Sequence, residues 1–143
     1  MTLHVGDVVR IDLNDAHFYA KCVCVHPTYH EVLAIDPNRY DALLASPDAL
    51  SFSEFVIAPL SQALQLGRLK GQVESHLSHH SLLTMPLFRF AVRDSNGLPI
   101  YWWLWDGNSI KIAEADRDIS GLPERKLTSI SDLKTRWVHH TDE

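Results

Sequence analysis

Residues 88–105 read FRFAVRDSNGLPIYWWLW. Apolar residues at 88, 90 and 92 alternate with other residues, as in a strand that buries one face. Asn96-Gly97 follows, and this dipeptide tolerates the positive φ angles that a tight hairpin turn requires. The chain then returns through an apolar run at 100–105. The stretch therefore predicts a β-hairpin and indicates an antiparallel sheet.

The returning strand carries three of the four tryptophans of the chain. Alternation along a strand places Trp102 on one face, and Trp103 with Trp105 on the other. No single core face can hold all three rings. The strand is therefore either covered on both sides or exposes an aromatic surface, and exposed apolar patches typically mark a contact surface.

Three further strands are predicted near the N-terminus, at Val5–Leu13, Phe18–His26 and Glu31–Ile35. Asn14-Asp15 supplies a turn between the first two. Short strands joined by tight turns favour an antiparallel meander or a small curled barrel. Additional strands are expected at residues 52–60 and 109–113.

A few short helices complete the expected fold. Asn38 is placed to cap a helix that runs to Ala45. Residues 62–77 approximate a helical stripe, against which Gly67 and Gly71 count. The tail from Ser131 predicts a helix in which residues 130, 133 and 137 share one side. We therefore expect an α+β, mainly β fold in a single domain, residues 1–143.

Composition limits the classes of partner. With 143 residues, of which 45% are hydrophobic, the chain can form one core. The net charge of −5 argues against general affinity for nucleic acid or anionic membranes, and permits a basic protein partner. No apolar run is long enough to span a bilayer, and the first residues do not form a signal peptide, so a cytoplasmic location is expected.

Residues of catalytic or metal-binding type are present, but without a recognised signature. His76, His79 and His80 could reach one metal ion, yet no Asp or Cys stands at a matching spacing, so a hydrated loop is favoured. Cys22 and Cys24 lie too close in sequence to close a structural disulfide loop, and a second pair for zinc is absent. Because no nucleophile elbow or phosphate-binding glycine loop occurs either, we expect no catalytic activity, no cofactor and no metal. A metal-dependent or hydrolytic enzyme built on the three histidines remains the third alternative.

Acidic residues follow the tryptophan strand. Between Asp106 and Glu124 they outnumber the basic residues, and aromatic anchors surrounded by charge are typical of specific protein interfaces. The opposing interpretation is that the tryptophans form core while the acids only solvate the surface. The predicted partner-binding residues are Trp103, Trp105, Asp106, Glu114, Asp116 and Asp118.

Several short segments resemble the immunity protein 26 family of bacterial polymorphic toxin systems. The resembling segments are Val5–Leu13 with its Gly-Asp opening, Phe18–Val23, Met85–Arg89, Trp105–Gly107 and Leu122–Arg125. The resemblance implies a cytoplasmic immunity protein that binds a cognate toxin domain delivered by neighbouring cells and neutralises it by occlusion, without catalysis or cofactor. A basic toxin domain would suit the acidic balance of the chain. The alternative is a small-barrel protein-interaction or adaptor module with no catalytic activity, because a Gly-Asp before a strand is common in small barrels.

Overall fold

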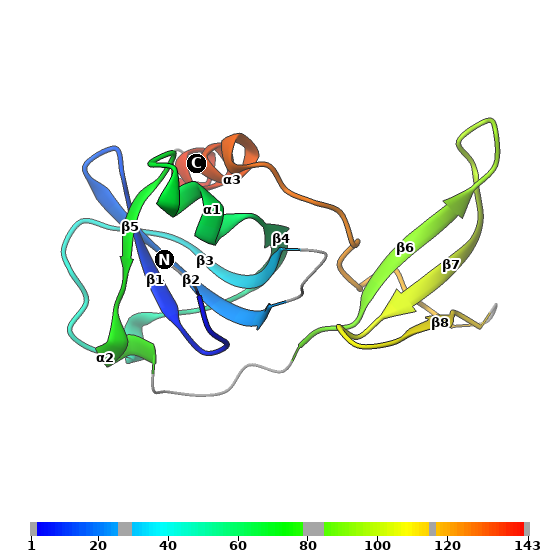
Figure 1. Ribbon diagram of the computed structural model, residues 1–143, viewed down its shortest axis with the longest axis horizontal. Coiled ribbons are helices and arrows are strands. Elements are labelled where there is room, and N and C mark those ends of the chain that lie inside the picture. The colour runs from blue at the N-terminus through cyan, green and yellow to red at the C-terminus, as the bar shows by residue number, and fades with distance from the viewer. Residues whose placement is uncertain (1–2, 26–29, 79–84, 115–116, 142–143) are drawn as a thin grey trace. The chain divides into compact units, whose positions relative to one another are not determined.

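The computed structural model describes residues 3–25, 30–78, 85–114 and 117–141 (Figure 1). The chain divides into two compact units. Unit 1 consists of residues 1–83 and 127–143, and unit 2 of residues 84–126. The assignment of residues 1–143 to a single domain stays a prediction. None of the helices in the described ranges is both long enough and apolar enough to cross a membrane.

Unit 1 is built on a five-stranded antiparallel sheet of order β4-β3-β2-β1-β5. Its strands are β1 (Val8–Leu13), β2 (Ala16–Val25), β3 (Glu31–Tyr40), β4 (Glu54–Ala58) and β5 (Lys70–Val73). The turn from β1 to β2 holds Asn14 and Asp15 at φ 53° and 60°, in the left-handed region that Asn and Asp tolerate. The predicted antiparallel meander and the mainly β class are confirmed. Within the described residues the sheet does not close into a barrel.

One face of this sheet forms the main core. Alternate residues such as Val9, Ile11 and Phe18 are fully buried there. Helices α1 (Leu60–Gln65) and α3 (Ile130–Thr141) contribute to the same core and lie on the same side of the sheet (Figure 1). The predicted C-terminal helix is confirmed, and its stripe of residues 130, 133 and 137 belongs to this core.

The opposite face carries a smaller apolar cluster beside a buried carboxylate. Asp36 is fully buried and accepts hydrogen bonds from the backbone N–H groups of Asn38 and Ser51, both at 2.9 Å, and from the Tyr40 hydroxyl. The predicted helix from Asn38 to Ala45 is therefore wrong: β3 continues to Tyr40 instead. Asn38 donates to Asp36, and its side-chain amide also points there at 2.8 Å, so it does not cap a helix.

The stretch 62–77 also departs from the expected helical stripe. Helix α1 ends at Gln65, and Gly67 adopts a φ of 72°, which a glycine accommodates at the end of a helix. Gly71 then lies in β5, opposite Ile11 of β1. A four-residue helix, α2 (Ser75–Ser78), follows. The two glycines thus divide the apolar stripe between a helix and a strand.

Gly71→Ala is expected to destabilise unit 1 by about 1–3 kcal/mol. A Cβ atom at this position would overlap the backbone carbonyl oxygen of Arg10, which cannot move without disturbing the ladder between β1 and β5. Gly121→Ala is the control, because a Cβ there meets nothing within 4 Å. Urea unfolding measures both. Equal stability of the two variants would contradict the close approach of β5 to β1.

Unit 2 is a three-stranded antiparallel sheet of order β6-β7-β8. Its strands are β6 (Phe88–Arg93), β7 (Pro99–Trp105) and β8 (Ile110–Ile112). The predicted hairpin is confirmed, and Gly97 takes the positive φ, 82°, in its turn. A strand near 109–113 is confirmed as β8. The segment around Glu124 runs parallel to β6 and forms a bridge with Arg89.

Candidate interaction surface

The register of β6, β7 and β8 gathers aromatic side chains on one face of the unit 2 sheet. Residues directly opposite each other project to the same side. These pairs are Phe88 with Trp105, Phe90 with Trp103, Val92 with Tyr101, Trp105 with Ile110 and Trp103 with Ile112. Trp102 and Leu104 project to the other side. The prediction that the three tryptophans divide between two faces is therefore confirmed.

The rings on this face contact one another. Phe90 stacks on Trp103 with ring centroids 6.5 Å apart, and Tyr101 meets Trp103 edge-on at 5.9 Å. The Arg125 guanidinium lies 4.4 Å from the centroid of Phe90 and 5.1 Å from that of Trp105. On the opposite face, Arg89 covers Trp102 at 4.7 Å. Stacking and cation–π contacts fix the orientation of the rings before any partner arrives.

Exposure increases along β7 toward the hairpin. Trp105 is 2% exposed, Trp103 is half-buried and Tyr101 is 40% exposed. Trp105 is therefore buried and cannot contact a partner directly, whereas Trp103 and Tyr101 are accessible to one. We call the accessible set the aromatic face. It consists of Phe90, Val92, Tyr101, Trp103, Ile110 and Ile112.

Two of the predicted acidic residues shape turns. The Asp106 carboxylate accepts from the backbone N–H groups of Ser109 at 2.7 Å and Asn108 at 2.9 Å, and these bonds lower its pKa. Asp118 accepts from the Ser120 hydroxyl at 2.7 Å and from the Ser120 N–H at 3.0 Å, which lowers its pKa likewise. Both carboxylates therefore remain ionised at neutral pH while they hold their turns.

The predicted acidic residues do not gather at one place in the described part of unit 2. Glu114 is exposed and lines a hollow together with Asp106, Lys111 and Arg117, so the acids there alternate with bases. Asp118 does not line this hollow, and Asp116 lies outside the described residues. Unit 2 as a whole contains as many Lys and Arg as Asp and Glu, so the net charge of −5 resides in unit 1.

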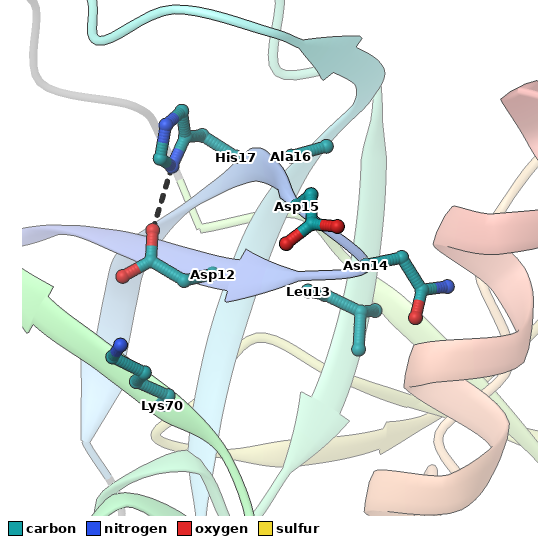
Figure 2. A pocket seen from close by; sticks show the side chains of 7 residues that line it. All are labelled: Asp12, Leu13, Asn14, Asp15, Ala16, His17 and Lys70. Atoms are coloured by element: carbon teal, nitrogen blue, oxygen red, sulfur yellow. Dashed lines mark hydrogen bonds and ion pairs between the residues drawn. The ribbon is translucent and has the colours of Figure 1, made fainter.

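A second polar site lies at the β1–β2 turn in unit 1. Figure 2 shows Asp12 and His17 facing each other across the two strands, with Lys70 of β5 beside them. The His17 Nδ1 lies 2.6 Å from Asp12 Oδ1, and Arg10 is ion-paired with Asp12 at 3.1 Å and with Glu74. This network was not predicted from the sequence, although Arg10 and Asp12 at alternate positions of one strand were its signal.

The electrostatics of this site depend on Asp12. Burial alone would raise the pKa of Asp12, but hydrogen bonds from His17 and Arg10, together with the Arg10 charge, outweigh it and lower the pKa. A histidine held by a carboxylate can act as a base through its other nitrogen. The pocket at this turn is lined by Lys70 and by the carboxylates of Asp12 and Asp15, and none of its lining residues in the described part of the chain is a serine, threonine or cysteine.

Asp12 should make stability depend on pH in the acid range. Because its pKa is lower in the folded state, its stabilising contribution is fully present above the ordinary value of 3.8. The contribution is lost as pH falls through the folded-state pKa. We therefore expect Asp12→Asn to lower the free energy of unfolding more at pH 5 than at pH 3, as measured by urea unfolding. An equal loss at both pH values would contradict the network.

The other predicted candidates do not assemble into a site in the described part of the chain. No group of three or more His, Cys, Asp or Glu residues there could hold a metal ion. His76 contacts the Leu44 carbonyl through Nε2 at 2.9 Å, while His79 and His80 lie outside the described residues. Cys22 and Cys24 are both free, and burial raises the pKa of Cys22 to about 12, so this thiol stays protonated and unreactive.

Comparison with known protein families, with curated proteins and with solved structures finds no match for this chain. The candidate surface therefore rests on its own geometry.

Proposed function

We propose that this chain binds a protein toxin domain and neutralises it by covering a surface that the toxin needs. The aromatic face of unit 2 carries this proposal, because it offers oriented rings that a partner can bury. Trp103 and Tyr101 are accessible there, beside the exposed Ile110 and Ile112. The resemblance of the sequence to the immunity protein 26 family supports a toxin as the partner.

The aromatic face has the composition of an interface centre. Large aromatic side chains contribute most of the binding free energy in specific complexes, because they bury much area with few rotatable bonds. Trp103 lies between Phe90 and Tyr101, so its ring is already positioned when a partner binds. Occlusion by such a surface requires no reacting group on this chain.

Charge would act mainly on the rate of encounter. A basic toxin domain would be attracted by the acidic excess of unit 1 and by the carboxylates that follow β7 in unit 2, Asp106, Glu114 and Asp118. The two acidic regions make different predictions, because only the second belongs to the unit that carries the aromatic face.

Glu114→Gln/Asp118→Asn is expected to slow association with the toxin domain roughly twofold to fivefold at low salt, with little change in dissociation. Asn at 118 keeps an acceptor for Ser120, so the turn persists while the charge is lost. Stopped-flow association across a salt series measures the effect. The control, Asp41→Asn/Asp48→Asn, removes the same charge from exposed positions in unit 1. Equal slowing by both pairs would show that association depends on the net charge of the chain and not on the carboxylates of unit 2.

The proposed function is tested by recovering the partner and expressing it. Tagged chain is used to isolate a stoichiometric partner from native cells, and the partner's domain is then expressed in a host with and without this chain. Growth arrest that this chain relieves supports the proposal. A partner that does not harm growth when expressed alone overturns it and favours the adaptor module.

A further inference from the structure

The two edge strands of the unit 2 sheet, β6 and β8, differ in whether another segment of the chain pairs with them. At the β6 edge, Arg89 donates its backbone N–H to Pro123 O at 2.9 Å and accepts from Arg125 N at 2.7 Å. The outward backbone N–H and C=O of Arg89 are therefore satisfied by the chain's own 123–125 segment, which covers the β6 edge at this position. Covering an edge in this way prevents a foreign strand from pairing with it.

The β8 edge has no such cover among the described residues. Ala113 N donates to Trp102 O at 2.9 Å, so these directly opposed residues form a hydrogen-bonded pair. By alternation, Lys111 is bonded to β7, whereas the N–H and C=O groups of Ile110 and Ile112 point away from it. Their side chains are 47% and 58% exposed. β8 therefore presents two outward donors, two outward acceptors and two apolar side chains.

We propose that β8 is the docking edge for an extended segment of the toxin domain, which adds a fourth strand to the unit 2 sheet. This inference rests on the proposed function and names the way in which the partner is held. Backbone hydrogen bonds to Ile110 and Ile112 give such a complex its affinity, and alternate side chains give it specificity. The added strand would extend the aromatic face.

Charge selects a foreign segment over a second copy of this chain. Two β8 strands that paired antiparallel through Ile110 and Ile112 would place Lys111 directly opposite its own counterpart. Like charges in opposed positions destabilise a strand pair. Lys111 is exposed, and Glu114 lies exposed just beyond the strand. The edge is therefore complementary to a strand of mixed charge with a defined order.

The register specifies that order for an antiparallel segment. A basic residue would face Glu114, and an apolar residue would face Ile112. An acidic residue would then face Lys111, followed by an apolar residue opposite Ile110. Read from the N-terminus, the segment has the pattern basic, any residue, apolar, acidic, apolar.

The test uses two synthetic peptides of identical composition. The first contains Lys-Thr-Val-Glu-Val, and the second exchanges its two charges as Glu-Thr-Val-Lys-Val. Titration of each into the full chain is followed by the NMR shifts of the backbone amides of residues 110–113. We expect saturable shifts with the first peptide, and binding roughly fivefold weaker with the second. Absence of saturable shifts in β8, or equal affinity for the two peptides, would overturn the proposal.

Two variants separate strand addition from side-chain contact. Ile112→Pro removes an outward N–H without removing a bond to β7, so it should abolish binding of the first peptide while the amide spectrum of β6 and β7 persists. Ile112→Thr keeps the N–H and should retain binding. If Ile112→Pro binds the first peptide as tightly as the natural chain does, the proposal is overturned. It is also overturned if the chain alone self-associates and Ile112→Pro abolishes that self-association. If only the docking edge is wrong, this chain still relieves the growth arrest that the toxin domain causes. If the proposed function is wrong, this chain does not relieve growth arrest.

Discussion

Trp137→Ala is expected to lower the free energy of unfolding of unit 1 by about 3–5 kcal/mol. Trp137 is fully buried on α3, and its ring lies 5.5 Å from that of Phe18. Its Nε1 also donates to the backbone carbonyl of Asp36 at 3.1 Å, so the side chain ties the C-terminal helix to β3. Alanine would leave a large cavity and remove this hydrogen bond. Urea unfolding followed by circular dichroism measures the loss.

Trp137→Phe separates packing from hydrogen bonding. Phenylalanine keeps an aromatic ring against Phe18 but cannot donate to the Asp36 carbonyl, so it should cost less than alanine and still lose the contribution of this hydrogen bond. If Trp137→Ala unfolds no more easily than Trp137→Phe, the ring does not fill the core as the structure shows. If Trp137→Phe matches the natural chain, the indole bond contributes no net stability.

Elements whose signal is local could be predicted from the sequence. The β6–β7 hairpin follows from alternation around Asn96-Gly97, and helix α3 follows from three apolar residues at helical spacing. The turn at Asn14-Asp15 is of the same kind. In each case, residues adjacent in the sequence determine the conformation, so no knowledge of distant partners is needed.

Elements that depend on distant partners could not be predicted. β3 continues through Pro37 to Tyr40 because Asp36 is buried and binds the backbone of Ser51, fifteen residues away. Pro37 is tolerated because β4 pairs with β3 only from Glu31 to Ile35, so no ladder bond to β4 is lost at this position. β5 is likewise a strand because Gly71 can approach Arg10 closely.

The candidate surface was predicted in part. Strand alternation was sufficient to place Trp103 and Trp102 on opposite faces. The burial of Trp105 could not be predicted from alternation, because it depends on Phe88 and on Arg125 from a segment twenty residues later in the chain. The charge distribution also required the structure, since only the division into units shows that the acidic excess lies outside the tryptophan sheet.

Trp103→Ala is expected to weaken binding of the toxin domain by about 2 kcal/mol or more, about thirtyfold in Kd. Trp103 is half-buried between Phe90 and Tyr101, and it has enough accessible surface for a partner to desolvate. Truncation removes this area and loosens both neighbouring rings. Isothermal titration calorimetry with the isolated toxin domain measures the change.

Trp102→Ala is the matched control, because it deletes the same side chain from the opposite face, where Arg89 covers it. We expect it to weaken binding less than Trp103→Ala, and thermal unfolding of both variants shows whether either loss reflects stability. A larger effect of Trp102→Ala would assign the interface to the face that Arg89 covers. If Trp103→Ala unfolds the sheet, Trp103 belongs to the core. The partner must then bind residues that can be truncated without unfolding the sheet, and the exposed Tyr101 and the β8 edge are the first to test.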